Sequence, residues 1–379
     1  MNFAFSEEQE ELRRAVRQFL EAKSPETEVR RLMETTEGYD PAVWKQMGQE
    51  LMLQGLAIPE EYGGQGFTFI ELGIVLEEMG RVLLCAPYFS SVVLAAGAIL
   101  AAGTDAEKKA LLPGIASGDT IAALAFTEPS GKWDAAGITM EATKAGDGYT
   151  LTGEKMFVID GHVADQIVVV ARTAGTSGTD GISFFTVAGD AAGLTRTALQ
   201  TMDTTRKQAR LEFDGVAARR LGEPGAGWLA LSKTLDQAAV CLANEMVGGA
   251  QKVLEMSVEY AKVRVQFGRP IGSFQAIKHK CADMMVKLEA ARSAVYWAGC
   301  VAADPSAPNL VLAASAAKAA ASDAAFFCAG SALQIFGGVG FTAEYDIQLY
   351  FKRARSNAAL LGDVAFHREQ VAQRIGLDA

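Results

Sequence analysis

Histidine and cysteine are both scarce in this sequence of 379 residues, which contains three histidines and five cysteines. A metal site built on several imidazoles is therefore not expected, and no metal site is predicted. The cysteines are scattered, odd in number and without Cys-x-x-Cys spacing, so we expect reduced, buried thiols of a cytoplasmic protein rather than disulfides. They are Cys85, Cys241, Cys281, Cys300 and Cys328.

The sequence also lacks an excess of basic residues and any segment expected to enter a membrane. There are 35 Lys and Arg residues against 45 Asp and Glu, for a net charge of -10, so nucleic acid and anionic membrane surfaces are not expected partners. The first residues pass directly into Ser6-Glu7-Glu8, without the basic region and apolar run of a signal peptide. Leu310–Phe327 is interrupted by Lys318 and Asp323, and we expect it to be too polar to insert into a bilayer.

What the sequence does contain is the composition of a large globular core, with 50% apolar and 21% charged residues. Its length predicts two or three structural units. Changes in apolar periodicity place them at 1–120, 121–222 and 223–379. We predict an α+β fold with an N-terminal helical domain, a middle β-barrel or sandwich domain and a C-terminal four-helix bundle.

Local signals support each of these assignments. Ser6-x-x-Gln9 is a capping box ahead of apolar residues at helical spacing. Asp147-Gly148 predicts a hairpin turn between two alternating runs of the middle segment. Three sustained apolar-periodic runs predict the long helices of the last segment. These runs are Leu235–Val263, Phe274–Ala302 and Leu310–Phe336.

Two motifs lie in the middle segment. The first is Phe126-Thr127-Glu128-Pro129, followed by Ser130-Gly131-Lys132-Trp133-Asp134. The second runs from Gly153 to Gly161 and reads Gly-Glu-Lys-Met-Phe-Val-Ile-Asp-Gly. From the residues alone, they read as a proline-containing turn and as a strand that carries an aromatic side chain near its end.

Two further motifs lie in the last segment. The stretch from Arg264 to Gln275 reads Arg-Val-Gln-Phe-Gly-Arg-Pro-Ile-Gly-Ser-Phe-Gln and predicts a turn between two helices. The stretch from Gln334 to Phe341 reads Gln-Ile-Phe-Gly-Gly-Val-Gly-Phe. Its glycines would let backbone N–H groups approach a phosphate closely, although a glycine-rich turn alone is weak evidence.

Together, the four motifs and the order of the segments resemble the acyl-CoA dehydrogenase family. The resemblance implies FAD as cofactor, with Arg264 on the pyrophosphate, because a guanidinium offers a planar fork to phosphate oxygens. It also implies a flavin site shared between subunits. The residues that it assigns to FAD are Phe126, Thr127, Phe157, Ile159, Arg264, Phe267, Gln275, Gln334, Gly337 and Gly338. Those that it assigns to the substrate are Ser130, Trp133 and Arg206.

The resemblance further implies α,β-dehydrogenation of an acyl-CoA thioester, in which a carboxylate removes the α proton and flavin N5 accepts the β hydride. This sequence departs from the family at the base. Gly362 and Ala238 occupy the two positions where family members carry a glutamate. Asp363, one residue later in the same loop, is the first candidate. Glu245, two helical turns beyond Ala238, is the second candidate, and a structural ion pair is the alternative role for it.

Three interpretations remain open at this point. The first is a homotetrameric dehydrogenase that passes electrons to an electron-transferring flavoprotein, and its motifs resemble those of bacterial members that degrade steroids and other bulky acids. The second is a non-catalytic subunit of an α2β2 assembly with a paralogue, which Trp133 in place of serine and Ile159 in place of threonine would fit. The third is a flavin-dependent relative with altered chemistry.

Overall fold

The computed structural model describes residues 5–377 as two compact units. Residues 1–4, on which part of the signal-peptide expectation rests, and residues 378–379 lie outside this range. Of the described residues, one unit, here called the bundle unit, comprises 5–30, 69–84 and 239–377. The other, the barrel unit, comprises residues 31–68 and 85–238. The segment 1–120 that was predicted as one helical domain thus contributes residues to both units.

The barrel unit is built around a seven-stranded sheet that closes on itself. Strand β5 pairs with both β4 and β7, which joins the two ends of the path β4-β2-β3-β7-β5 into a barrel. Its interior is lined by inward-facing apolar side chains of β4 and β5, most of them buried. The strands are β1 (Ala122–Ala125), β2 (Glu141–Ala145), β3 (Gly148–Ile159), β4 (Gln166–Thr173), β5 (Ile182–Ala188), β6 (Leu194–Ala198) and β7 (Gln208–Leu221).

A hairpin joins β2 and β3, as the sequence predicted. The turn lies at Gly146–Asp147, because Ala145 pairs with Gly148, so it is one residue earlier than the Asp147-Gly148 signal. The helical elements of this unit include a seven-residue π-helix, η2, whose residues are all buried. They are α3 (Pro41–Gln49), η1 (Glu60–Tyr62), η2 (Phe89–Ala95), α5 (Ala96–Ala102), α6 (Asp105–Ser117) and η3 (Ala135–Gly137).

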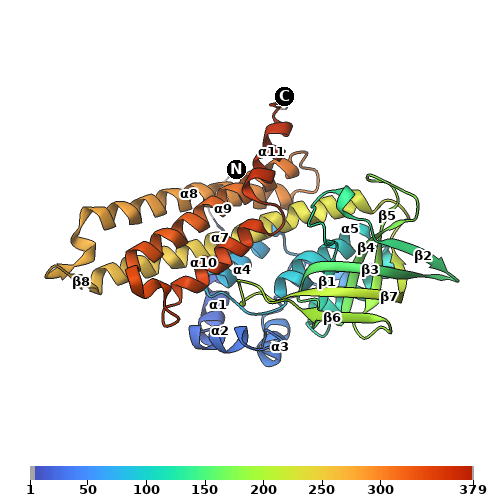
Figure 1. Cartoon of the computed structure of the whole chain (residues 1–379), viewed down its shortest axis with the longest axis horizontal. Coiled ribbons are helices and arrows are strands. Elements are labelled where there is room, and N and C mark those ends of the chain that lie inside the picture. Colours follow the sequence, from blue (N-terminus) through green and yellow to red (C-terminus); the bar gives the residue numbers. More distant parts are fainter. Residues whose placement is uncertain (1–4, 378–379) are drawn as a thin grey trace. The chain divides into compact units, whose positions relative to one another are not determined.

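Long helices packed side by side form the bundle unit (Figure 1). The predicted capping box is confirmed, since Ser6 accepts from the Gln9 amide and Gln9 reaches back to the Ser6 amide. The elements are α1 (Glu7–Lys23), α4 (Phe69–Arg81), α7 (Gly227–Val263), β8 (Val265–Gln266), β9 (Arg269–Pro270), η4 (Ile271–Ser273), α8 (Gln275–Ala303), α9 (Leu310–Phe336), η5 (Gly337–Phe341), α10 (Ile347–Ala359) and α11 (Val364–Arg374). Helix α7 begins in the barrel unit and continues into the bundle unit, and α2 (Glu26–Met33) spans the boundary at residues 30 and 31.

Two adjacent buried carboxylates, Glu77 and Glu78 on α4, tie the bundle unit together. Arg13 donates to Glu77 at 2.9 Å, and Arg292 also pairs with Glu77. Arg17 donates to Glu78 at 2.7 Å. Because buried charges are tolerated only when they are paired and hydrogen-bonded, these contacts specify how α1 and α8 pack on α4.

Helix α9 is the most apolar element of the bundle. Within the described residues, Leu310–Phe341 is the one helical stretch long and apolar enough to cross a membrane by length and composition, so the expectation that this run is too polar was wrong. In the structure, 56% of its most apolar window is buried. It packs against α8, α10 and α11, which accounts for its composition as a core helix.

Candidate active site

The loop that follows β1 carries the first predicted group of site residues. Phe126 and Thr127 are buried, and the Met156 amide of β3 donates to the Thr127 carbonyl at 2.9 Å. Ser130 is exposed at the tip of the loop, and Trp133 is half-buried. The Trp133 ring lies 5.7 Å from that of Phe126, so the loop carries an aromatic pair where the resemblance implies a small hydroxyl residue.

A buried ion pair holds this loop against β3. Lys155 Nζ donates to Glu128 Oε1 at 2.7 Å and to the Phe126 carbonyl at 3.3 Å. Glu128 also accepts from the amides of Thr139 and Met140. Complete burial lowers the pKa of Lys155 to about 8, against the opposing effect of Glu128. Both residues lie within the quoted motifs, but no pattern in the sequence showed that they pair.

The end of β3 presents an exposed aromatic side chain. Phe157 is 45% exposed and adopts a left-handed backbone conformation with φ 57°, while Ile159 two residues later is buried. A left-handed φ is unfavourable for an aromatic residue, and strained backbone of this kind clusters at functional sites; here it accompanies a β-bulge between Lys155 and Val158. An exposed phenyl ring on such a backbone fits a planar ring system that packs against it.

Arg206 lies elsewhere in the barrel unit, in the turn before β7. Its guanidinium carbon is 5.0 Å from the centre of the Phe89 ring, at the first residue of η2, and the residue is buried. Asp203 in the same turn accepts from the Thr205 amide at 3.0 Å. The arginine is therefore part of a folded, buried turn rather than a mobile surface charge.

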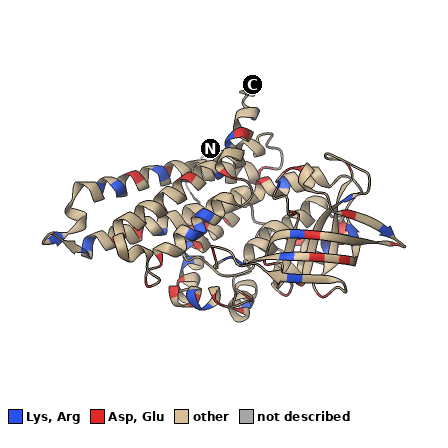
Figure 2. Ribbon diagram, in the orientation of Figure 1, with Lys and Arg blue, Asp and Glu red and all other residues tan. Residues whose placement is uncertain are grey.

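In the bundle unit, the hairpin β8–β9 carries the predicted phosphate-binding arginine. Arg264 and Phe267 are exposed, Phe267 by 93% with φ 52°, and Gln275 is exposed at the start of α8. Several Lys and Arg residues lie on the hairpin and on the helix ends that flank it, and these stretches of ribbon are blue in Figure 2. They include Arg264, Arg269 and Lys278, whereas Lys262 at the end of α7 is already paired with Glu259. Such a cluster suits an anionic ligand on a chain whose net charge is negative.

The glycine-rich end of α9 is tied to the same end of α7. Tyr260 stacks on Phe336 with ring centres 4.1 Å apart, and its hydroxyl donates to the Phe336 carbonyl at 3.5 Å. Gln334 and Gly338 are exposed beside it, and Gly337 has φ 65°. A Cβ at Gly337 or Gly338 would meet no atom within 4 Å, so the backbone there is open to a bound group.

These features fit the cofactor that the motifs imply. A dinucleotide with an aromatic ring system needs apolar surfaces for its rings and N–H donors for its phosphates. The chain offers two exposed phenyl rings on left-handed backbone, an exposed arginine in a basic cluster and an open glycine turn. In the barrel unit, the residues that could contact a flavin ring lie in the loop after β1 and at the end of β3. In the bundle unit, the groups that could bind the phosphates of a flavin dinucleotide are Arg264 and the backbone at Gly337.

The two candidate bases differ in their surroundings. Asp363 is exposed and caps α11, accepting from the Phe366 amide at 2.8 Å. Glu245 is buried in α7, where Arg353 donates to it at 2.9 Å and Asn357 at 3.0 Å. These three residues line a small cavity between α4, α7, α9 and α10. The structural ion pair considered for Glu245 is thus present, and Arg353 and Asn357 gave no signal in the sequence.

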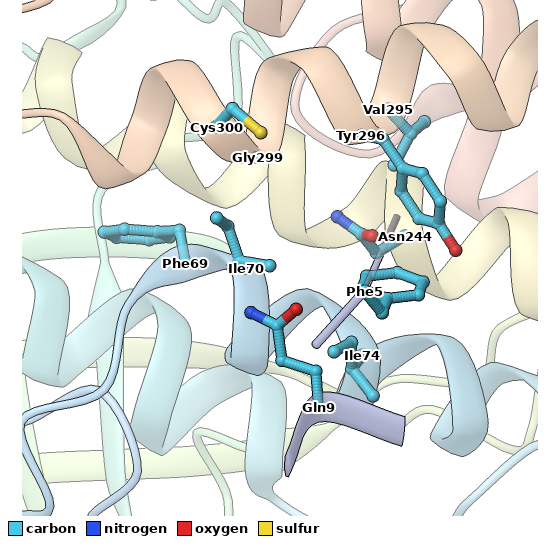
Figure 3. Close-up of a pocket in the computed structure, with 10 residues that line it drawn as sticks. All are labelled: Phe5, Gln9, Phe69, Ile70, Ile74, Asn244, Val295, Tyr296, Gly299 and Cys300. Atoms are coloured by element: carbon cyan, nitrogen blue, oxygen red, sulfur yellow. The ribbon is translucent and has the colours of Figure 1, made fainter. Parts of the chain in front are cut away.

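A second cavity of the bundle unit contains none of the predicted site residues. It is lined by aromatic side chains of Phe5, Phe69 and Tyr296, with the amides of Gln9 and Asn244 pointing into the same space (Figure 3). Its walls are otherwise apolar, and it offers no carboxylate or imidazole for acid–base chemistry.

Three family profiles match the chain in succession. "Acyl-CoA dehydrogenase, N-terminal domain" matches residues 6–119. "Acyl-CoA dehydrogenase, middle domain" matches residues 123–216, and "Acyl-CoA dehydrogenase, C-terminal domain" matches residues 225–376. The three matches follow the same order as the motifs and together span nearly the whole chain.

Individual proteins show the same similarity over their full lengths. Acyl-CoA dehydrogenase IpdE2 of Mycobacterium tuberculosis is 34% identical over 358 residues, covering 94% of this chain and 93% of that protein. The structure of butyryl-CoA dehydrogenase from Megasphaera elsdenii superposes with a TM-score of 0.92 at 31% identity, over 99% of this chain and 100% of that one. The ChsE4–ChsE5 complex from Mycobacterium tuberculosis contains a chain with a TM-score of 0.89 at 28% identity, over the full length of both.

Proposed function

Since this chain belongs to the acyl-CoA dehydrogenase family, we propose that it binds FAD at the residues described above and oxidises a bulky acyl-CoA, branched or polycyclic in its acyl group. The reaction itself follows from the family: the chain is an acyl-CoA dehydrogenase, an oxidoreductase that acts on CH–CH donors. The observation that carries this conclusion is the full-length match to enzymes of this one activity, with the same three domains in the same order.

For the cofactor, the proposal rests on residues of each unit taken separately. In the barrel unit, Phe157 presents its ring to the flavin, and the loop carrying Phe126 and Thr127 supplies backbone groups to the ring edge. In the bundle unit, Arg264 pairs with the pyrophosphate, and Phe267 and Gln275 contact the adenosine half. When bound, FAD supplies the hydride acceptor of the reaction.

The protein's own part in the reaction is acid–base chemistry and orientation. A carboxylate within hydrogen-bond reach of the substrate takes the α proton, and Asp363 is the candidate in the loop where the family carries its base. The carboxylate Oδ1 of Asp363 already accepts one backbone N–H, from Phe366, which fixes the direction of the side chain. Backbone N–H groups beside the thioester oxygen would stabilise the enolate-like charge that develops there.

The size of the acyl group is inferred from the barrel unit and from one relative. The Phe126–Trp133 pair adds aromatic surface beside the loop that the resemblance assigns to ring and thioester binding. The solved steroid acyl-CoA dehydrogenase Tcur3481–Tcur3483 supports the same substrate class, because a chain of it superposes on this chain with a TM-score of 0.87 at 31% identity. A bulky, largely apolar acyl group is the substrate that such a surface favours.

The bundle unit also supports self-association. On α8, Met285 and Val286 are 57% and 67% exposed, and Phe267 on the adjoining hairpin is 93% exposed. Met285 and Val286 are adjacent in α8, and exposed apolar surface of this kind is typical of protein interfaces. We infer that this surface binds a second acyl-CoA dehydrogenase chain, either a copy of itself in a homotetramer or a paralogue, and that an electron-transferring flavoprotein accepts the electrons.

The test is the visible spectrum of the chain purified alone, before and after anaerobic addition of a panel of acyl-CoAs. The proposal predicts a flavin spectrum that bleaches with a bulky acyl-CoA and not with butyryl-CoA. Bleaching by short straight chains only would overturn the substrate class. A colourless protein that gains flavin and activity on addition of a paralogous chain would replace the homotetramer with the heteromeric assembly.

A further inference from the structure

A buried lysine holds the loop that carries Asp363. Lys318 lies in the middle of α9 and is fully buried. Its ammonium group donates to Gly362 O at 3.1 Å, to Ser322 Oγ at 3.2 Å and to Ala358 O at 3.5 Å. An ammonium has three N–H donors, so these contacts account for all of them, and two of the three acceptors are backbone carbonyls around the loop between α10 and α11.

A buried histidine holds the same loop from its other side. His367 Nε2 lies 3.0 Å from the Leu361 carbonyl, and Nδ1 lies 3.2 Å from Ser315 Oγ. Burial, followed by the nearby Lys318 charge, lowers the pKa of His367 to about 4, so the ring is neutral near pH 7. A carbonyl can only accept, so Nε2 carries the proton and Nδ1 accepts from the Ser315 hydroxyl.

The backbone between these contacts has an unusual conformation. Leu361 has φ 60° and Gly362 has φ 100°, and Asp363 then returns to the extended region to cap α11. A left-handed leucine is disfavoured and persists only where its surroundings impose it. The two carbonyls that bracket this turn, those of Leu361 and Gly362, are the ones that His367 and Lys318 bind.

We propose that Lys318 is a positioning residue for the reaction: together with His367, it fixes the left-handed turn at Leu361–Gly362 and thereby aims the carboxylate of Asp363. The proposal rests on the proposed function, in which Asp363 is the base. Lys318 and Ser315 both project from α9, so the core helix of the bundle sets the direction of the base through the backbone of the loop. In the sequence alone, Lys318 only interrupts an apolar run.

An apolar residue would fill the place of Lys318 at lower cost if packing were its only role. Burying an ammonium without a carboxylate bonded to it is expensive, and long apolar side chains often replace buried charges with a gain in stability. The described contacts of the Lys318 ammonium are instead one hydroxyl on its own helix and two carbonyls that flank the strained turn. This arrangement serves the conformation of the loop.

The experiment compares Lys318→Met with Met284→Ala. Met284 is also buried in the bundle, and its carbonyl lies 3.6 Å from Cys328 Sγ. Cys328 is ten residues beyond Lys318 on α9, so this variant weakens the core far from the loop. Two quantities are measured: hydrogen–deuterium exchange of the amides of residues 360–364, and the single-turnover rate of flavin bleaching by the acyl-CoA that bleaches the wild type. Flavin content and acyl-CoA affinity are measured alongside.

For Lys318→Met, we expect faster exchange in the loop and a bleaching rate lowered by about a hundredfold, the scale of a misplacement of about 1 Å, with flavin content and acyl-CoA affinity retained. Met284→Ala should lower the melting temperature without either effect. If Lys318→Met does not fold, Ser315→Ala, which removes only the hydroxyl bonded to His367, should give the same two changes to a smaller degree. Unchanged loop exchange, or a normal bleaching rate with a loosened loop, overturns the proposal.

The same experiment separates the two levels of inference. If none of the acyl-CoAs bleaches the flavin of the wild type, the proposed function fails. The exchange measurement alone then decides whether Lys318 holds the turn. If the wild type bleaches and the Lys318 variant loses stability but keeps the loop exchange and the bleaching rate of the wild type, as expected for Met284→Ala, the proposed function stands and the positioning role is wrong.

Discussion

Lys155 and Glu128 form an ion pair in the interior of the barrel unit, with Nζ 2.7 Å from Oε1 and with 0% and 5% of their side chains exposed. This pair joins β3 to the loop that carries Phe126 and Thr127. Removing one partner of a buried pair leaves the other charge uncompensated, so we expect Lys155→Met to lower the free energy of unfolding by about 3–5 kcal/mol. Urea denaturation followed by circular dichroism measures this change.

Lys144→Met is the matched control for that prediction. Lys144 is an exposed lysine on β2 of the same barrel, and its loss should change the free energy of unfolding by no more than about 0.5 kcal/mol. The double variant Glu128→Gln, Lys155→Met should lose less than the sum of its single variants, because neither charge is then left alone. Equal losses for Lys155→Met and Lys144→Met would show that the pair contributes nothing to stability.

Retention of FAD should depend on Arg264. This side chain is exposed on the β8–β9 hairpin, so its replacement by alanine removes a charge without opening the core. A hydrogen bond to a charged group contributes about 1.5–3 kcal/mol, and Arg264→Ala should weaken FAD binding by that amount. Titration of the apoprotein with FAD, followed by flavin fluorescence, gives the dissociation constant.

Lys262→Ala controls for the general loss of positive charge at this hairpin. Lys262 lies two residues before Arg264 and pairs with Glu259 on the exposed surface of α7. We expect FAD affinity close to that of the wild type for this variant. Flavin occupancy that is the same in Arg264→Ala as in the wild type would remove Arg264 from the cofactor site.

The sequence predicted those elements whose signals are local. Helix α9 begins and ends at Leu310 and Phe336, as its periodicity indicated, because proline residues precede it and glycines follow it. The capping box at Ser6 and Gln9 is likewise local, and its two hydrogen bonds span three residues. Family membership was also within reach, since each motif is a short contiguous stretch.

Contacts between distant parts of the chain were beyond such reasoning. Glu245 pairs with Arg353, which lies 108 residues away, and Lys318 binds the Gly362 carbonyl, 44 residues away. Nothing in the residues near Lys318 distinguishes it from a solvated lysine on an amphipathic helix. The π-helix at Phe89–Ala95 gave no signal either, because its residues read equally well as part of an ordinary helix.

Acid should destabilise the protein through His367. Its pKa in the folded state is lowered to about 4 from an ordinary 6.5, so between these values the unfolded chain takes up a proton that the folded chain does not. Stability therefore rises with pH across this window and is lost as the pH falls through it, by about 3 kcal/mol in all. Lys318 adds little to this slope below about pH 6, because burial lowers its pKa only to about 7 and it stays mostly charged in both states there.

Urea unfolding at a series of pH values from 7 to 4 tests this prediction. For the wild type, the free energy of unfolding should fall by about 3 kcal/mol over this range because of His367. In His367→Gln the amide can still bond to the loop but does not titrate, so the slope that His367 contributes should disappear. If the stability of this variant falls with acid as steeply as that of the wild type, the effect belongs to carboxylates such as Glu128. Burial raises the pKa of Glu128, but Lys155 and hydrogen bonds lower it by more, so its pKa lies below the ordinary value.

The identity of the base can be decided with two conservative substitutions. Asp363 caps α11, and asparagine caps a helix about as well as aspartate, so Asp363→Asn should leave fold and flavin content intact. It cannot accept the α proton, and we expect turnover to be abolished.

Glu245→Gln, in contrast, removes the negative charge of the buried ion pair with Arg353, so it should lower stability by about 3–5 kcal/mol while the folded fraction still turns over. Steady-state turnover with a bleaching acyl-CoA, normalised to bound flavin, separates these effects. Normal turnover in Asp363→Asn together with an inactive, flavin-loaded Glu245→Gln would transfer the role of base to Glu245. Turnover in both variants would mean that neither carboxylate is needed.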